Sequence, residues 1–155
     1  MGLPKAYKSL ASTWIQTTVC GLILAIVVHT VIYANSSTKI IIDCSQTLEK
    51  DGGFKNFSEF YPFYLCEHSL PVTKLFHFVA TFNAAIFLLM ALNAKASSTK
   101  LRCLAFALVQ AYGMAWISHF FLEQNKPATF KYPSFSFMAD WVMFKDALVG
   151  KHALF

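Results

Sequence analysis

Charged side chains are scarce in this sequence of 155 residues. They make up 14% of the chain, and only 8 residues are acidic, whereas a soluble globular domain carries about 25% charged residues. Hydrophobic residues make up 56% of the chain, and the mean hydropathy is +0.49. Because a soluble fold of this size cannot bury so much apolar surface, the composition favours an integral membrane protein.

Sequence motifs of several common enzyme classes are also absent. The chain has no G-x-S-x-G motif, no glycine-rich phosphate-binding loop and no H-E-x-x-H motif. The net charge of +5 does not come from a basic stripe interleaved with aromatic residues, because the basic residues are spread along the chain beside apolar runs. This distribution suits anionic lipid headgroups and predicts no nucleic-acid partner.

No C-x-x-C pair is present among the four cysteines, which are Cys20, Cys44, Cys66 and Cys103. We expect free thiols in a reducing compartment. The alternative is a bridge between Cys44 and Cys66, which requires that their loop faces an oxidising lumen.

Three apolar runs, 14–34, 72–93 and 101–122, are each long enough to span a bilayer. The first run has no A-x-A cleavage site and is longer than the apolar part of a signal peptide, so we expect an uncleaved anchor. Gly21 and Ala25 recur at the spacing of one helix face. Small side chains on that face let a second helix approach closely.

The connections between these runs define the expected topology. The short polar turn 94–100 makes the second and third spans an antiparallel hairpin, and the aromatic segment 57–64 is typical of a membrane interface. A further helix is expected over 136–149, where Asp140 and Lys145 make it amphipathic and therefore interfacial or half-inserted, with a fourth span as the alternative. The predicted fold class is an all-α integral membrane protein with three transmembrane helices and this C-terminal helix.

Membrane orientation depends on a small difference in basic residues. Three spans place five basic residues on one side, namely Lys5, Lys8, Lys95, Lys100 and Arg102. The positive-inside rule favours the cytoplasm for that side. The opposite side also carries lysines, so the preference is weak; these are Lys39, Lys55, Lys74, Lys126 and Lys131.

Four of the five histidines are expected at the same membrane face. His29 lies near the end of the first span and His119 near the end of the third, while His68 and His77 lie at the start of the second. Ionisable groups in membrane segments are costly, which makes them candidates for function. His152 follows the last predicted helix and is expected to stay outside this group.

Several imidazoles close to a carboxylate are suited to metal binding, and neutral imidazole is a ligand of iron, zinc and copper. Two or three histidines with one carboxylate and open coordination positions are typical of non-haem iron(II) oxygenases. Glu123 follows His119 by about one helical turn and is expected to lie above it. The pattern predicts a metal site of His68, His77 and His119, with His29 as a further candidate. Each histidine taken alone also fits a structural role.

Two segments carry a resemblance to a known family. They run from Tyr61 to Phe78, which includes Glu67-His68 and Phe76-His77, and from Ala111 to Pro133, which includes Trp116, Ser118-His119 and Asn125-Lys126-Pro127. Over about residues 57–151 the chain resembles the fungal 2-hydroxy-fatty-acid dioxygenase family, a membrane domain long without an assigned function. The resemblance divides the chain into an N-terminal anchor helix with a polar loop, 1–56, and a dioxygenase-like membrane domain, 57–151.

The resemblance implies an endoplasmic-reticulum enzyme that uses iron(II) and O2 to shorten a 2-hydroxy fatty acid by one carbon, the reaction of α-oxidation. The implied iron ligands map to His68, His77 and His119. We interpret Glu67 and Glu123 as candidate catalytic carboxylates. The candidate substrate contacts are Asn125, Lys126, Lys131, Tyr112 and Trp116.

The sequence departs from the family at three positions and leaves other functions open. Many family members have asparagine where Leu70 and Thr73 stand and glycine where Ala80 stands. One alternative is a non-catalytic membrane subunit that keeps the fold within a larger complex. The other is a lipid-binding protein whose histidines sense pH. A homo-oligomer, and another organelle membrane such as the mitochondrial inner membrane, also remain open.

Overall fold

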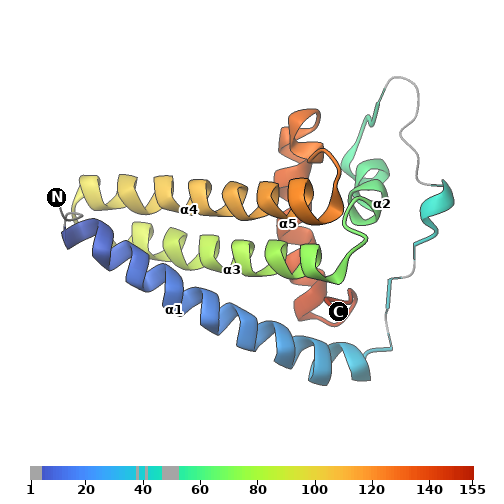
Figure 1. Ribbon diagram of the computed structural model, residues 1–155, viewed down its shortest axis with the longest axis horizontal. Coiled ribbons are helices and arrows are strands. Elements are labelled where there is room, and N and C mark those ends of the chain that lie inside the picture. Colours follow the sequence, from blue (N-terminus) through green and yellow to red (C-terminus); the bar gives the residue numbers. More distant parts are fainter. Residues whose placement is uncertain (1–4, 38, 41, 47–52) are drawn as a thin grey trace.

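Three long helices run lengthwise beside one another, and the shorter helices gather at one end (Figure 1). This computed structural model describes residues 5–37, 39–40, 42–46 and 53–155, and every regular element in these ranges is helical. The long helices are α1 (Lys5–Val27), α3 (Pro71–Asn93) and α4 (Ser97–Ile117). The short helix α2 (Phe57–Cys66) and the crossing helix α5 (Pro133–Leu148) contact each other, and α5 also contacts α3. The predicted all-α fold is confirmed.

Three helical segments are long and apolar enough to cross a membrane, as predicted: Lys8–Tyr33, Pro71–Asn93 and Ser97–Glu123. The first and third continue through π-helical turns, η1 (Val28–Tyr33) and η3 (Ser118–Glu123). Both helices begin earlier than expected. The hydropathy pattern assigned the polar residues before each apolar run to loops, but these residues form the first helical turns. For example, α4 already begins at Ser97, where the backbone leaves the extended conformation of Ala96.

The close approach predicted for the first span is confirmed. A Cβ atom at Gly21 would lie 3.1 Å from Cδ1 of Phe82 and 3.4 Å from Cγ1 of Val79, both on α3. Ala25 is fully buried at the same contact. The amide of Asn83 donates to Oγ1 of Thr18 at 2.9 Å. Small side chains and one interhelical hydrogen bond therefore hold α1 against α3.

Helices α3 and α4 form the predicted antiparallel hairpin and are joined by a buried hydrogen bond. Nε2 of Gln110 donates to the carbonyl oxygen of Ala80 at 3.1 Å. Large apolar side chains on the outside remain exposed, as a lipid-facing surface requires. They include Leu89, Leu92, Leu101, Val109 and Phe121.

The aromatic segment before the second span forms helix α2, which was not predicted. Asn56 caps its start: Oδ1 accepts a hydrogen bond from the backbone N–H of Glu59 at 3.0 Å, and Nδ2 donates to the Glu59 carboxylate at 2.8 Å. Phe60 and Tyr64, one turn apart, are buried against Met143 of α5. The segment predicted to lie at the membrane interface therefore also forms a packed aromatic cluster inside the protein.

Helix α5 crosses the ends of the long helices beside α2 (Figure 1). It begins at Pro133, three residues before the predicted start, because proline fits the first helical position. The charged residues predicted an amphipathic helix, but Asp146, which belongs to that pattern, does not face solvent. That carboxylate is buried, with Tyr61 donating to it at 3.1 Å and Nζ of Lys145 at 3.2 Å.

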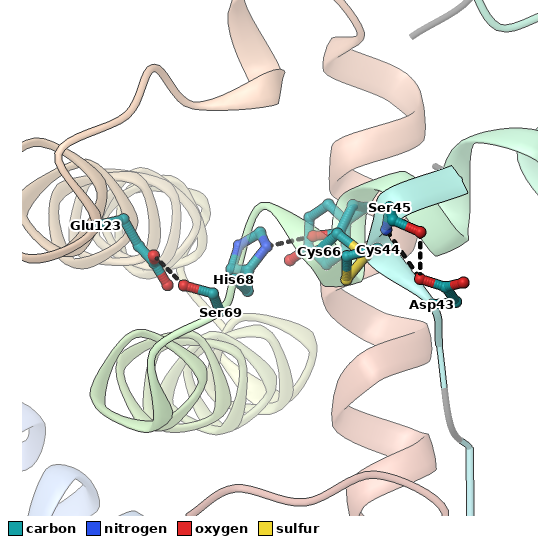
Figure 2. Close-up of a disulfide and its surroundings, with 8 residues drawn as sticks. Asp43, Cys44, Ser45, Cys66, His68, Ser69 and Glu123 are labelled. Carbon is teal, nitrogen blue, oxygen red and sulfur yellow. Dashed lines mark hydrogen bonds between the residues drawn. A yellow bond between two sulfur atoms is a disulfide. The ribbon is translucent and has the colours of Figure 1, made fainter. Parts of the chain in front are cut away.

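A disulfide joins Cys44, in the short helix η2 (Cys44–Gln46), to Cys66 at the end of α2. Figure 2 shows this bridge beside His68. The expectation of four free thiols is therefore wrong for this pair, whereas Cys20 and Cys103 are free. Helix η2 therefore lies against α2, a contact that the cysteine spacing alone does not reveal.

Candidate metal centre

Three histidines from three different segments meet at the end of the bundle. His68 lies in the link between α2 and α3, His77 lies in the second turn of α3, and His119 lies in η3. All three are buried, with exposed fractions of 1%, 4% and 2%. The ring centroids are 4.3 Å apart for His68 and His77, 4.6 Å for His68 and His119, and 5.2 Å for His77 and His119. One ring nitrogen of each lies within 4.8 Å of the others, so the group could hold a metal ion.

Every Nδ1 atom in this group faces an oxygen acceptor. The pairs are His68 with the carbonyl oxygen of Tyr64 at 2.6 Å, His77 with Oδ1 of Asp140 at 2.7 Å, and His119 with Oδ1 of Asn125 at 2.7 Å. Each Nδ1 atom therefore carries the hydrogen, and each Nε2 atom of a neutral ring keeps a free lone pair. Metal-binding histidines in proteins are fixed in this way.

The two Nε2 atoms of His68 and His77 lie 3.2 Å apart. With both hydrogens on the Nδ1 atoms, these are two facing lone pairs that repel each other. A shared cation removes this repulsion and satisfies both nitrogens. The donor set and its orientation therefore fit a divalent metal that accepts imidazole ligands.

Asn125 is held in the orientation that His119 needs. Gln124 adopts a left-handed conformation (φ 57°, ψ 33°), which ends η3 and turns the chain back. The amide nitrogen of Asn125 donates to the carbonyl oxygen of Glu67 at 3.0 Å and to its carboxylate at 3.1 Å. Because Nδ2 is committed to these acceptors, the carboxamide oxygen faces the imidazole of His119.

Asp140 orients His77 from α5, and sequence reasoning had not assigned it a role in the site. The hydroxyl of Tyr64 donates to the same carboxylate oxygen, Oδ1, at 2.5 Å. Burial, reinforced by the Asp140 carboxylate, raises the pKa of Tyr64 well above its usual value, so the phenol keeps its proton. The only sequence signal for Asp140 was an acidic residue in a largely apolar helix.

Burial lowers the pKa of His68 well below its usual value, and the neighbouring rings of His77 and His119 lower it further. His68 is therefore a neutral imidazole near neutral pH. Neutral imidazole is the form that binds a metal ion.

Neither of the two predicted catalytic carboxylates, Glu67 and Glu123, belongs to the three-histidine group that could hold a metal ion. The carboxylate of Glu123 accepts hydrogen bonds from the backbone N–H of Leu70 at 2.7 Å and from the hydroxyl of Ser69 at 2.9 Å (Figure 2). Glu67 contacts Asn125, and burial raises the pKa of its carboxyl.

His29 does not belong to the group of three histidines found in the described part of the chain. Its ring stacks on Tyr33 at 5.4 Å and meets the edge of Phe155 at 4.8 Å. His152 is also outside the group, as expected. It is buried, and burial followed by the nearby charge of Lys74 lowers its pKa to about 4.

The predicted substrate contacts are dispersed. Asn125 touches His119, as described above, whereas the ring of Trp116 stacks on Phe130 at 5.5 Å. Lys126 and Lys131 are exposed. Tyr112 lines a cavity of about 290 Å³ between α3, α4 and α5, which Asp140 also lines.

The family comparison matches residues 54–152 to the family described as "2-hydroxy-palmitic acid dioxygenase Mpo1-like". The chain belongs to this family. All three clustered histidines and the three residues bonded to their Nδ1 atoms lie inside the matched segment, whereas α1 precedes it. This match confirms the resemblance that the sequence motifs indicated. No curated protein and no solved structure matches the chain.

Proposed function

We propose that this protein is a membrane-embedded, non-haem iron(II) dioxygenase that shortens 2-hydroxy fatty acids by one carbon. The observation that carries the proposal is the set of three buried imidazoles whose Nδ1 atoms all face acceptors. The description of the family supports the reaction and the substrate class. Iron(II) held there would supply the redox chemistry that a reaction with O2 requires.

The charge of the site supports an anionic substrate. Imidazole ligands contribute no negative charge, and neither Glu67 nor Glu123 belongs to the ligand group. A divalent ion in this group keeps its positive charge and attracts the carboxylate of a 2-hydroxy acid. The donor set also leaves coordination positions open, as enzymes that bind O2 and substrate together require.

The surrounding residues have two tasks in this proposal. Asp140, Asn125 and the Tyr64 carbonyl hold the imidazoles in the tautomer that directs Nε2 inward. The aromatic cluster of α2 and α5 covers the site and excludes water.

The test combines metal content with O2 consumption. Detergent-purified protein is loaded anaerobically with iron(II), analysed for metal, and then assayed with 2-hydroxypalmitate. We expect near-stoichiometric iron and substrate-dependent O2 uptake in the wild type, and loss of both in His77→Ala and His119→Ala. His29→Ala is the matched control, because this histidine lies outside the group, and it should keep its iron.

Two results would contradict the proposal. Wild-type protein that binds no iron after anaerobic loading favours a non-catalytic subunit. Protein that binds the fatty acid without iron or O2 uptake favours a lipid-binding role.

A further inference from the structure

The cavity between α3, α4 and α5 differs in chemistry along its length. Thr81, one helical turn after His77, and Asp140, which bonds directly to His77, line one end of it. The walls farther away are Leu88 of α3 together with Leu104 and Leu108 of α4. One end of the cavity is therefore polar and next to the candidate metal centre, and the other end is purely apolar.

The position of each wall residue along its helix gives the depth of the cavity. On α3, Thr81 lies four residues beyond His77 and Leu88 lies eleven beyond it, which corresponds to about 6 Å and about 16 Å from the histidine. On α4, Leu104 lies fifteen residues before His119, or about 22 Å away. The apolar end thus lies deep within the membrane-spanning segments.

We propose that this cavity binds the alkyl chain of the fatty acid, with the carboxylate at the histidines and the methyl end near Leu88 and Leu104. The inference rests on the proposed function for the identity of the head group. It adds the location of the chain, its direction, and the residues that set its length.

A single alkyl chain is the occupant that the dimensions favour. One leaflet of the hydrocarbon core is about 15 Å thick and is spanned by one acyl chain, which is close to the depth of this cavity. The volume of about 290 Å³ lies at the lower end of ligand sites of about 300–1,000 Å³. A lipid with two chains would need a wider site. Alanines line the middle of the slot and leave the space for the chain; they are Ala84, Ala107 and Ala111.

The direction of the chain can be tested by fluorescence quenching without turnover. Trp141 lines the cavity next to Asp140, near its polar end, and Trp14→Phe with Trp116→Phe leaves it as the only tryptophan among the three. Saturated fatty acids carrying bromine either early in the chain or at the methyl end serve as probes. We expect strong quenching by the first probe and weak quenching by the second. Stronger quenching by the methyl-end probe overturns the proposed direction.

A pair of neighbouring residues tests the site itself. Ala84→Phe places a ring in the cavity about 10 Å from His77, whereas Ala85→Phe alters a residue that does not line it. Overpacking an occupied volume should weaken binding of a long chain roughly tenfold. Ala85→Phe should bind as the wild type does. Equal binding by the two variants overturns the proposal.

Substitution of Leu88, at the apolar end of the cavity, tests whether this wall sets the length of the fatty acid chain. In active protein, Leu88→Ala should shift the preferred substrate to longer chains, and Leu89→Ala, at a neighbouring position that does not line the cavity, should not. An unchanged preference in Leu88→Ala overturns the assignment of this wall. If the protein shows no iron or turnover but the quenching results hold, the chain site stands and the dioxygenase proposal fails.

Discussion

Nδ1 of His119 lies 2.7 Å from the carboxamide oxygen of Asn125, six residues later in the chain. The same carboxamide donates to Glu67, the residue before His68. One side chain thus connects the end of α4 to the link that carries another histidine of the group.

Replacing Asn125 by leucine should weaken metal binding. A leucine side chain cannot accept a hydrogen bond, so Asn125→Leu leaves Nδ1 of His119 without a partner and releases the ring. Loss of such a partner lowers metal affinity about 10–100-fold, which a titration with iron(II) measures. Lys126→Leu, at the exposed neighbouring position, is the control and should bind metal normally. Equal affinity in the two variants would show that the hydrogen bond has no such role.

The two buried or half-buried carboxylates of α5 should differ in their effect on the metal. Asp140 bonds to His77, whereas Asp146 bonds to Tyr61 and Lys145. Asp140→Asn removes the charge beside His77 and should lower metal affinity by about one order of magnitude. Asp146→Asn should change thermal stability without changing metal affinity. The comparison fails if both substitutions reduce metal binding equally.

The histidine end of the bundle should face an oxidising compartment. The Cys44–Cys66 bridge lies at that end, and the basic residues of the α3–α4 turn lie at the other. The bridge and the positive-inside rule therefore predict the same orientation.

Asn56 provides a natural reporter for this orientation. Asn56-Phe57-Ser58 is an acceptor for N-glycosylation, and it lies in the loop before α2. Asn35-Ser36-Ser37, at the end of the first span, is a second acceptor and is removed by Ser37→Ala. In that background we expect, in microsomal insertion assays, a glycan that Ser58→Ala removes, and no glycan on an acceptor placed in an N-terminal extension. The reverse pattern would contradict the orientation.

Acidification should destabilise the protein through His152. Its pKa in the folded protein is about 4, against an ordinary value of 6.5. Below about pH 6.5 the unfolded chain takes up a proton that the folded chain does not, so stability falls until the pH reaches about 4. The groups that face it are Lys74, which disfavours the proton, and Asp146, which favours it.

The loss can be measured as the change in melting temperature between pH 7 and pH 4.5. The corresponding loss in the free energy of unfolding is at most about 3 kcal/mol for a pKa shift of this size. In His152→Gln the acid-dependent loss should be smaller by this contribution. An identical pH dependence in the two proteins would assign the effect to other groups.

Hydropathy was sufficient to predict the three spans and the face at which the histidines meet. A run of apolar residues has the length of a bilayer, and a short polar turn forces two spans to be antiparallel. Those two facts place the start of α3 and the end of α4 at the same level, so His77 and His119 could be paired from sequence. No tertiary information was needed for this step.

The partners of the histidines could not be predicted in the same way. Asp140 lies 63 residues from His77, and the crossing of α5 depends on packing against α2 and α3. The local charge pattern predicted only an amphipathic helix. The hydrogen bonds of the Glu123 carboxylate to Ser69 and Leu70 also join residues more than fifty positions apart, so they too depend on tertiary packing. His29 has a suitable depth, but its ring packs against Tyr33 and Phe155.

The crossing of α5 also sets an order for the assembly of the centre. His68, His77 and His119 all precede α5 in the chain, so the hairpin that carries them is synthesised and inserted before Asp140 emerges. During that interval Nδ1 of His77 lacks its carboxylate partner. The hydrogen bond from His77 to Asp140 therefore forms only when α5 docks across the hairpin. A nascent chain halted between α4 and α5 would contain every proposed ligand, yet it would hold an ion loosely and exchange it readily.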